Sequence, residues 1–170
     1  MNGCEAASLL MALKYKEYLS NMSLYQFASD MPKSDNPYNG FYLDIFGTEP
    51  TNVSHWIAPE ALKNFGISSS GNANIVIGTG LSLYQLDREL DNNNPVIIYM
   101  TAKFVEPKNW SNNAHSNLHV QLLTGYNKIT GDQIIVDPWK YKTLSSYWSL
   151  NKNKAEHIYN AVGKRSVIVR

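Results

Sequence analysis

The feature that most constrains the fold of this sequence is a pair of strand-like segments joined by a short turn. Leu118–Tyr126 and Gln133–Val136 are rich in β-prone residues, and Asn127–Asp132 between them is a turn that contains a glycine. Two such segments around a turn predict a β-hairpin. Position 128, midway between His119 and Asp137, falls inside the turn. These two residues are therefore predicted to lie nearly opposite each other, with Cβ atoms about 5 Å apart.

The start of the chain predicts a helix over Cys4–Leu19, because its apolar residues recur close to the helical spacing. Asn2 and Gly3 precede this segment, and asparagine is a good N-cap. Glu5 adds a negative charge in the first turn, where the helix dipole favours it. Cys4 is thus predicted to lie at an exposed helix N-terminus.

The remaining pattern predicts a chain that is helix-rich in its first half and strand-rich in its second, which is an α+β fold. Helices are expected at 24–29, 58–65 and 83–90, and strands at 74–78, 96–101 and 166–170, with a turn-rich loop at 31–40. A length of 170 residues suits a single domain over 1–170.

Charge and hydropathy exclude two classes of protein. Fifteen Lys and Arg residues against fourteen Asp and Glu residues give a net charge of +1, which argues against a nucleic-acid-binding protein. The apolar runs are far shorter than the roughly 20 residues that span a bilayer, so no transmembrane segment is expected in this chain.

The sequence does not favour a metal site either. Cys4 is the only cysteine, so neither an internal disulfide nor a cysteine-rich zinc site can form. His115 and His119 have the spacing of a helical zinc pair, but Ser116 stands where the metalloprotease motif needs glutamate. The segment is also predicted to be loop and strand. We therefore expect no metal and no organic cofactor.

Cys4, His119 and Asp137 together fit nucleophilic catalysis. A thiolate is the reactive form of cysteine, and a helix N-terminus or a neighbouring imidazolium lowers the thiol pKa. The nucleophile needs a base, and the base needs a partner that orients it. Taken singly, the three residues have ordinary alternatives: a buried small hydrophobe, a satisfied strand histidine and a turn aspartate before proline. Catalysis explains the three together better.

Three motifs carry a resemblance to a known family: NGCEAASL at 2–9, HVQLLTGY at 119–126 and VDPW at 136–139. They resemble the papain-superfamily cysteine peptidases related to bacteriocin-processing (double-glycine) peptidases. The resemblance implies a papain-like fold with a helical lobe carrying Cys4 and an antiparallel sheet lobe carrying His119 and Asp137. It implies that Cys4 is the nucleophile and its backbone N–H an oxyanion donor, that His119 is the base, and that Asp137 orients it. The implied substrate is a peptide or protein.

The sequence departs from that family at its start. The family carries a glutamine several residues before the cysteine, which helps to form the oxyanion hole, and here only three residues precede Cys4. We therefore expect that a natural N-terminal segment is missing from this chain. The family also implies an extracytoplasmic location in a Gram-positive bacterium. Two alternatives stay open: a cell-wall peptide amidase, and a non-enzymatic surface or binding module with the same fold.

Overall fold

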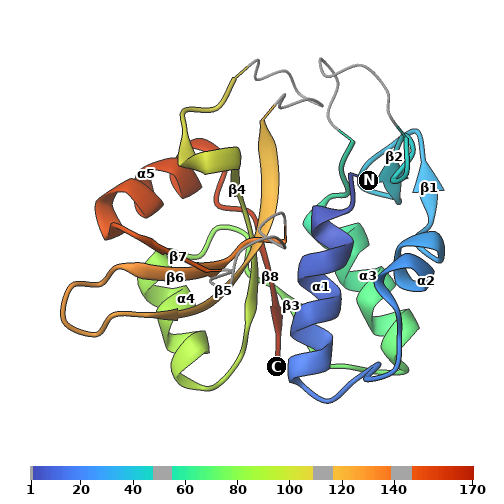
Figure 1. Ribbon diagram of the computed structural model, residues 1–170, viewed down its shortest axis with the longest axis horizontal. Coiled ribbons are helices and arrows are strands. Elements are labelled where there is room, and N and C mark those ends of the chain that lie inside the picture. The colour runs from blue at the N-terminus through green and yellow to red at the C-terminus, as the bar shows by residue number, and fades with distance from the viewer. Residues whose placement is uncertain (1, 48–54, 109–116, 139–146) are drawn as a thin grey trace.

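The computed structural model describes residues 2–47, 55–108, 117–138 and 147–170 (Figure 1). Its helices are α1 (Cys4–Tyr15), α2 (Leu24–Ser29), α3 (Pro59–Ser70), α4 (Leu83–Asp91) and α5 (Lys152–Ala161), with a short 3-10 helix η1 (Ala102–Phe104). Its strands are β1 (Lys33–Ser34), β2 (Phe41–Tyr42), β3 (Ile75–Ile77), β4 (Val96–Thr101), β5 (Leu118–Tyr126), β6 (Gln133–Val136), β7 (Tyr147–Leu150) and β8 (Ser166–Val169).

Six of these strands form one antiparallel sheet in the order β3-β8-β4-β5-β6-β7. The helices α1, α2 and α3 lie on one side of the sheet, and α4 and α5 lie on the other (Figure 1). Each side has its own apolar core: Leu9, Phe65 and Tyr99 belong to the first, and Ile98 and Tyr159 to the second. The predicted α+β fold, with a helical lobe against an antiparallel sheet, is confirmed.

Helix α1 packs its apolar stripe against β5, and Leu9 and Leu13 are fully buried in it. The helix ends at Tyr15, four residues earlier than predicted, because Glu17 has a positive φ of 65° and cannot continue it. The prediction of Asn2 as a side-chain cap was also wrong. Gly3 is the N-cap residue, and the Asn2 side chain instead donates to the carbonyl of residue 47 at 3.0 Å.

Helix α3 is longer than its sequence pattern predicts. It begins at Pro59 as expected but runs through Gly66, where the pattern places its end. A Cβ at Gly66 would lie 2.6 Å from Cδ1 of Ile75, so this glycine lets the helix approach β3 closely. The left-handed residue that ends the helix is Gly71, with a φ of 68°.

Strands β4, β5 and β6 have the predicted bounds, whereas β7 and α5 were not predicted. All six residues of β4 are buried, which fits its position inside the sheet. Within the described ranges, no helix combines the length and the apolar character needed to cross a bilayer.

Candidate active site

The β5–β6 hairpin brings the predicted base and its orienting residue to one face of the sheet. The observed pairing sets Leu122 opposite Val136, after a bulge nearer the turn. Asp137 therefore follows at the level of Gln121, two residues from the predicted position nearly opposite His119. Residues two apart on a strand share a face. His119 and Asp137 thus meet diagonally across the strand pair.

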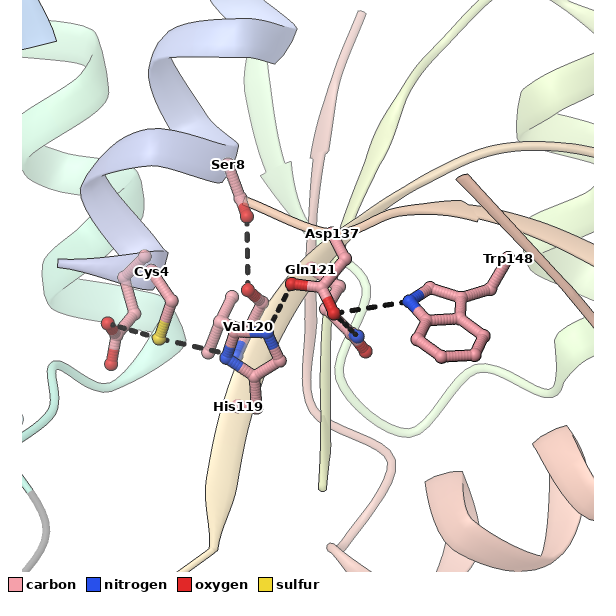
Figure 2. Close-up of polar contacts among 8 residues, drawn as sticks. Cys4, Ser8, His119, Val120, Gln121, Asp137 and Trp148 are labelled. Atoms are coloured by element: carbon pink, nitrogen blue, oxygen red, sulfur yellow. Dashed lines mark hydrogen bonds and ion pairs between the residues drawn. The ribbon is translucent and has the colours of Figure 1, made fainter. Parts of the chain in front are cut away.

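His119 and Asp137 form a short, buried contact. Nε2 of His119 lies 2.6 Å from Oδ1 of Asp137, and the two residues are 0% and 8% exposed. Figure 2 shows the carboxyl group between the His119 ring and the Trp148 ring. With Nε2 directed to the carboxylate, Nδ1 is the ring nitrogen that can take a proton from a nucleophile. The contact also fixes the orientation of the ring.

Two further donors hold the second oxygen of Asp137. Oδ2 accepts from Nε2 of Gln121 at 3.3 Å and from Nε1 of Trp148 at 3.2 Å. The Trp148 ring packs edge-on against Phe104, with ring centroids 5.7 Å apart. Hydrogen bonds of this kind favour the charged form of a carboxyl group. Sequence reasoning missed both donors, although the two-residue spacing of Gln121 from His119 predicts a shared face.

Cys4 is positioned by the edge of β5 beside His119. Strand β6 ends at Val136, which pairs with Leu122. Residues 118–121 of β5 therefore lie past the end of β6 and do not pair with it. Helix α1 supplies the partners instead: Sγ of Cys4 accepts the N–H of Val120 at 3.4 Å, and Oγ of Ser8 donates to the carbonyl of Val120 at 3.2 Å. Because buried backbone groups must be paired, this contact sets the position of the helix on the strand. It brings Cys4 to the residue that follows His119.

Glu5 is a further residue of the site that sequence reasoning did not assign to it. It is only 1% exposed, and its Oε2 accepts the thiol of Cys4 at 3.1 Å. Burial raises the pKa of Glu5 to about 7, against the opposing effect of hydrogen bonds from Cys4 and from the backbone of Glu5 and Ile57. Glu5 is therefore a buried carboxyl group beside the sulfur, and not an exposed first-turn charge.

The thiol of Cys4 does not have the lowered pKa that its helix position predicts. Desolvation of the sulfur, followed by the charge on Glu5, raises the pKa of Cys4 well above its ordinary value. The N–H of Val120 acts in the opposite direction. The residue as a whole is partly exposed, so its surface is accessible while its sulfur is turned toward protein groups. In this arrangement the sulfur is held as a thiol.

The buried Glu5 carboxyl group predicts a pH-dependent loss of stability. A folded-state pKa of about 7 against 4.5 means that stability falls as pH rises from 4.5 through 7, since the folded state disfavours the charged form. Between pH 5 and pH 8 the free energy of unfolding should fall by about 2 to 3 kcal/mol more in the parent than in Glu5→Gln. Urea unfolding at the two pH values measures this difference. The exposed Glu60→Gln variant should keep the parental pH dependence, and equal dependence in parent and Glu5→Gln would contradict the prediction.

The possible zinc pair lies partly outside the described residues, because these do not include His115. Nε2 of His119 is directed to Asp137. Across the described ranges, His, Cys, Asp and Glu side chains do not gather in groups of three or more that could hold a metal ion.

An antiparallel sheet, a helix whose first residue contacts strand β5, and a His–Asp pair on the β5–β6 hairpin are together typical of a papain-like peptidase architecture. The model of the Peptidase_C39 like family matches residues 1–167, and the chain belongs to this family. A crystal structure from Bacillus anthracis, provisionally described as a C39-like peptidase, has the same fold with a TM-score of 0.80. It is 23% identical, over 99% of this chain and 88% of that chain. No curated protein matches the chain.

Proposed function

We propose that this protein is a cysteine peptidase that hydrolyses peptide amide bonds through Cys4, His119 and Asp137. The observation that carries the proposal is the 2.6 Å contact between Nε2 of His119 and Oδ1 of Asp137. His119 lies on β5, next to Val120, whose N–H donates to Sγ of Cys4. Cys4 is thus hydrogen-bonded to the residue next to His119, and His119 to Asp137, which supports the roles of nucleophile, base and orienting carboxylate for the three residues. Membership of a peptidase-like family supports the same reaction class.

The proposed reaction is acyl transfer in two steps. The thiol proton of Cys4 passes to Nδ1 of His119, and the thiolate attacks the carbonyl carbon of the substrate amide. The backbone N–H of Cys4 donates to the developing oxyanion. His119 then gives its proton to the leaving amine, and a thioester remains on Cys4. Water, deprotonated by His119, hydrolyses the thioester and restores the thiol.

Asp137 acts on the ring and not on the substrate. Its hydrogen bond to Nε2 keeps Nδ1 in the orientation that faces a nucleophile, and its charge stabilises the imidazolium formed in both steps. Gln121 and Trp148 hold the carboxylate in place through its second oxygen. We further propose that the substrate is a peptide encountered outside the cytoplasmic membrane, as the family resemblance implies.

A substrate screen tests the proposal. The protein is incubated with a library of linear peptides and, separately, with muropeptides, and new termini are identified by mass spectrometry. Because Cys4 is the only cysteine, protein blocked with iodoacetamide is a matched control. We expect cleavage of linear peptides that the blocked protein does not show. Cleavage of muropeptides alone would select a cell-wall amidase instead, and cleavage that survives blocking would contradict a thiol mechanism.

A further inference from the structure

The carboxyl group of Glu5 is placed to control the chemical state of Cys4. Its Oε2 lies 3.1 Å from Sγ, and the backbone N–H groups of Glu5 and Ile57 are hydrogen-bonded to the same carboxyl group. The carboxyl group is thus held from both the helix and the segment before α3. Because only 1% of the residue is exposed, protein groups and not solvent surround the carboxyl group. The nucleophile assignment, taken from the proposed function, leaves this group without a role.

The other charged and titratable groups around Glu5 do not replace it in this position. Tyr99 from β4 lies near both Glu5 and Cys4, and burial first, then those two groups, raises the pKa of its hydroxyl group well above the usual value. It therefore stays neutral. Arg165, before β8, and Glu60, at the start of α3, act on Tyr99 with opposite signs. His119 precedes Val120 on β5 and is the proposed proton acceptor.

We propose that Glu5 is a proton-linked positioning residue, which holds Cys4 as a resting thiol when its carboxyl group is charged and allows the thiolate to form when it is neutral. This inference rests on the proposed role of Cys4 as nucleophile. As a carboxylate, Glu5 accepts a hydrogen bond from the S–H group of Cys4, and its charge disfavours a negative sulfur. As a carboxylic acid, it can donate its own O–H to the sulfur and stabilise the thiolate.

The change of state involves a single proton taken from solvent. That proton binds the Glu5 carboxylate, and the resulting O–H group donates to Sγ. The thiol proton of Cys4 moves to Nδ1 of His119, so the sulfur becomes negative and the ring positive. The O–H bond of Glu5 and the Nδ1–H bond of His119 form, the S–H bond of Cys4 breaks, and no other covalent bond changes. The thiolate–imidazolium pair of Cys4 and His119 should therefore form below about pH 7, where Glu5 is protonated, and be disfavoured above that pH.

The Glu5→Gln variant isolates this effect, because glutamine keeps the shape of the side chain and always has a donor to offer the sulfur. We measure the rate constant of Cys4 alkylation by iodoacetamide from pH 5 to pH 9. At pH 8 the variant should react about tenfold faster than the parent, which corresponds to about one unit of thiol pKa. At pH 5.5, where Glu5 of the parent is neutral, the two rates should agree.

The matched control is Glu60→Gln, which removes an exposed negative charge from the neighbouring helix and should follow the parental profile at every pH. A rate ratio between Glu5→Gln and parent that is the same at all pH values would overturn the inference, because a purely structural role has no reason to change with pH. A variant slower than the parent at pH 8 would overturn it as well.

The parent provides a second readout that does not depend on the folding of a variant. Its alkylation rate should fall as pH rises through about 7 and then rise again as the remaining thiol ionises; a steady rise would contradict the inference. Alkylation needs no substrate, so the two proposals can fail separately. Peptide cleavage together with an alkylation rate that is already high below pH 7 and rises steadily from there removes only the role of Glu5. The predicted fall without cleavage of any peptide removes only the peptidase assignment.

Discussion

Replacing Cys4 by alanine is expected to lower the rate of peptide hydrolysis on the order of 10⁵-fold, to the level of the background. The reaction proposed here passes through a thioester, and the chain contains no second thiol that could form it. The substitution removes the sulfur that accepts the N–H of Val120, but the hydrogen bond from Ser8 to the carbonyl of Val120 still holds α1 on β5, so the fold should survive. Release of a fluorescent or mass-tagged peptide fragment measures the loss.

A control on the same helix separates loss of the nucleophile from damage to α1. Lys14 is exposed in the last turn of the helix, and Lys14→Ala should keep the parental rate within about twofold. Hydrolysis by Cys4→Ala at more than one hundredth of the parental rate would mean that another group attacks the substrate.

Replacing Asp137 by asparagine is expected to lower kcat about 10⁴-fold while KM stays nearly unchanged. The carboxylate accepts from three donors, which belong to His119, Gln121 and Trp148. An asparagine has one acceptor oxygen and an NH₂ group, so at least one donor must face another donor. The imidazolium also loses its counter-charge. Steady-state kinetics on the peptide found in the screen measure both parameters.

Asp35→Asn is the matched control for this variant, because Asp35 is exposed and distant in sequence from the hairpin. It should leave kcat and KM unchanged. Circular dichroism of Asp137→Asn should overlay that of the parent, which shows that the loss lies in the chemical step. A folded variant with parental kcat would mean that the His119–Asp137 contact has no part in catalysis.

The hairpin shows how far local pattern predicts position. The bounds of β5 and β6 could be read from apolar and turn residues, because both strands are continuous in sequence. The register could not, because the observed turn pairs Tyr126 with Gln133 and is therefore centred beyond position 128. A bulge between Leu123 and Gly125 then moves the pairing by one residue. This register leaves Asp137 on the same face as His119, so the two side chains meet as predicted, with an offset of two positions from the predicted near-opposition.

The missed elements had signals of unequal strength. Helix α5 is preceded by Asn151, whose side chain accepts the N–H groups of residues 153 and 154, and Ala155, Ile158 and Tyr159 follow at helical spacing. These features were readable. Strand β7 is a four-residue edge strand with one buried residue, Leu150, and such a strand leaves little pattern in its sequence.

Glu5 is the site residue whose environment differs most from the one predicted from the sequence. Its position in the first turn predicts an exposed charge, and that prediction considers only the helix. Its burial comes from tertiary packing, including the backbone near Ile57, which lies more than 50 residues away in sequence. Trp148 was missed for the same reason, since its contact with Asp137 depends on the β6–β7 pairing. Neither contact has a local signature.

Cys4 and His119 are proposed to act as a pair, and the pH dependence of Cys4 alkylation in the parent and in His119→Ala tests this most directly. The single thiol reports without ambiguity. We predict fast alkylation of the parent well below pH 7, where an unpaired thiol with a pKa near 8.5 scarcely reacts, and loss of that reaction in His119→Ala. A midpoint near pH 8.5 or above in both proteins, with no fast reaction below pH 7, would show that the pair does not form and would contradict the account.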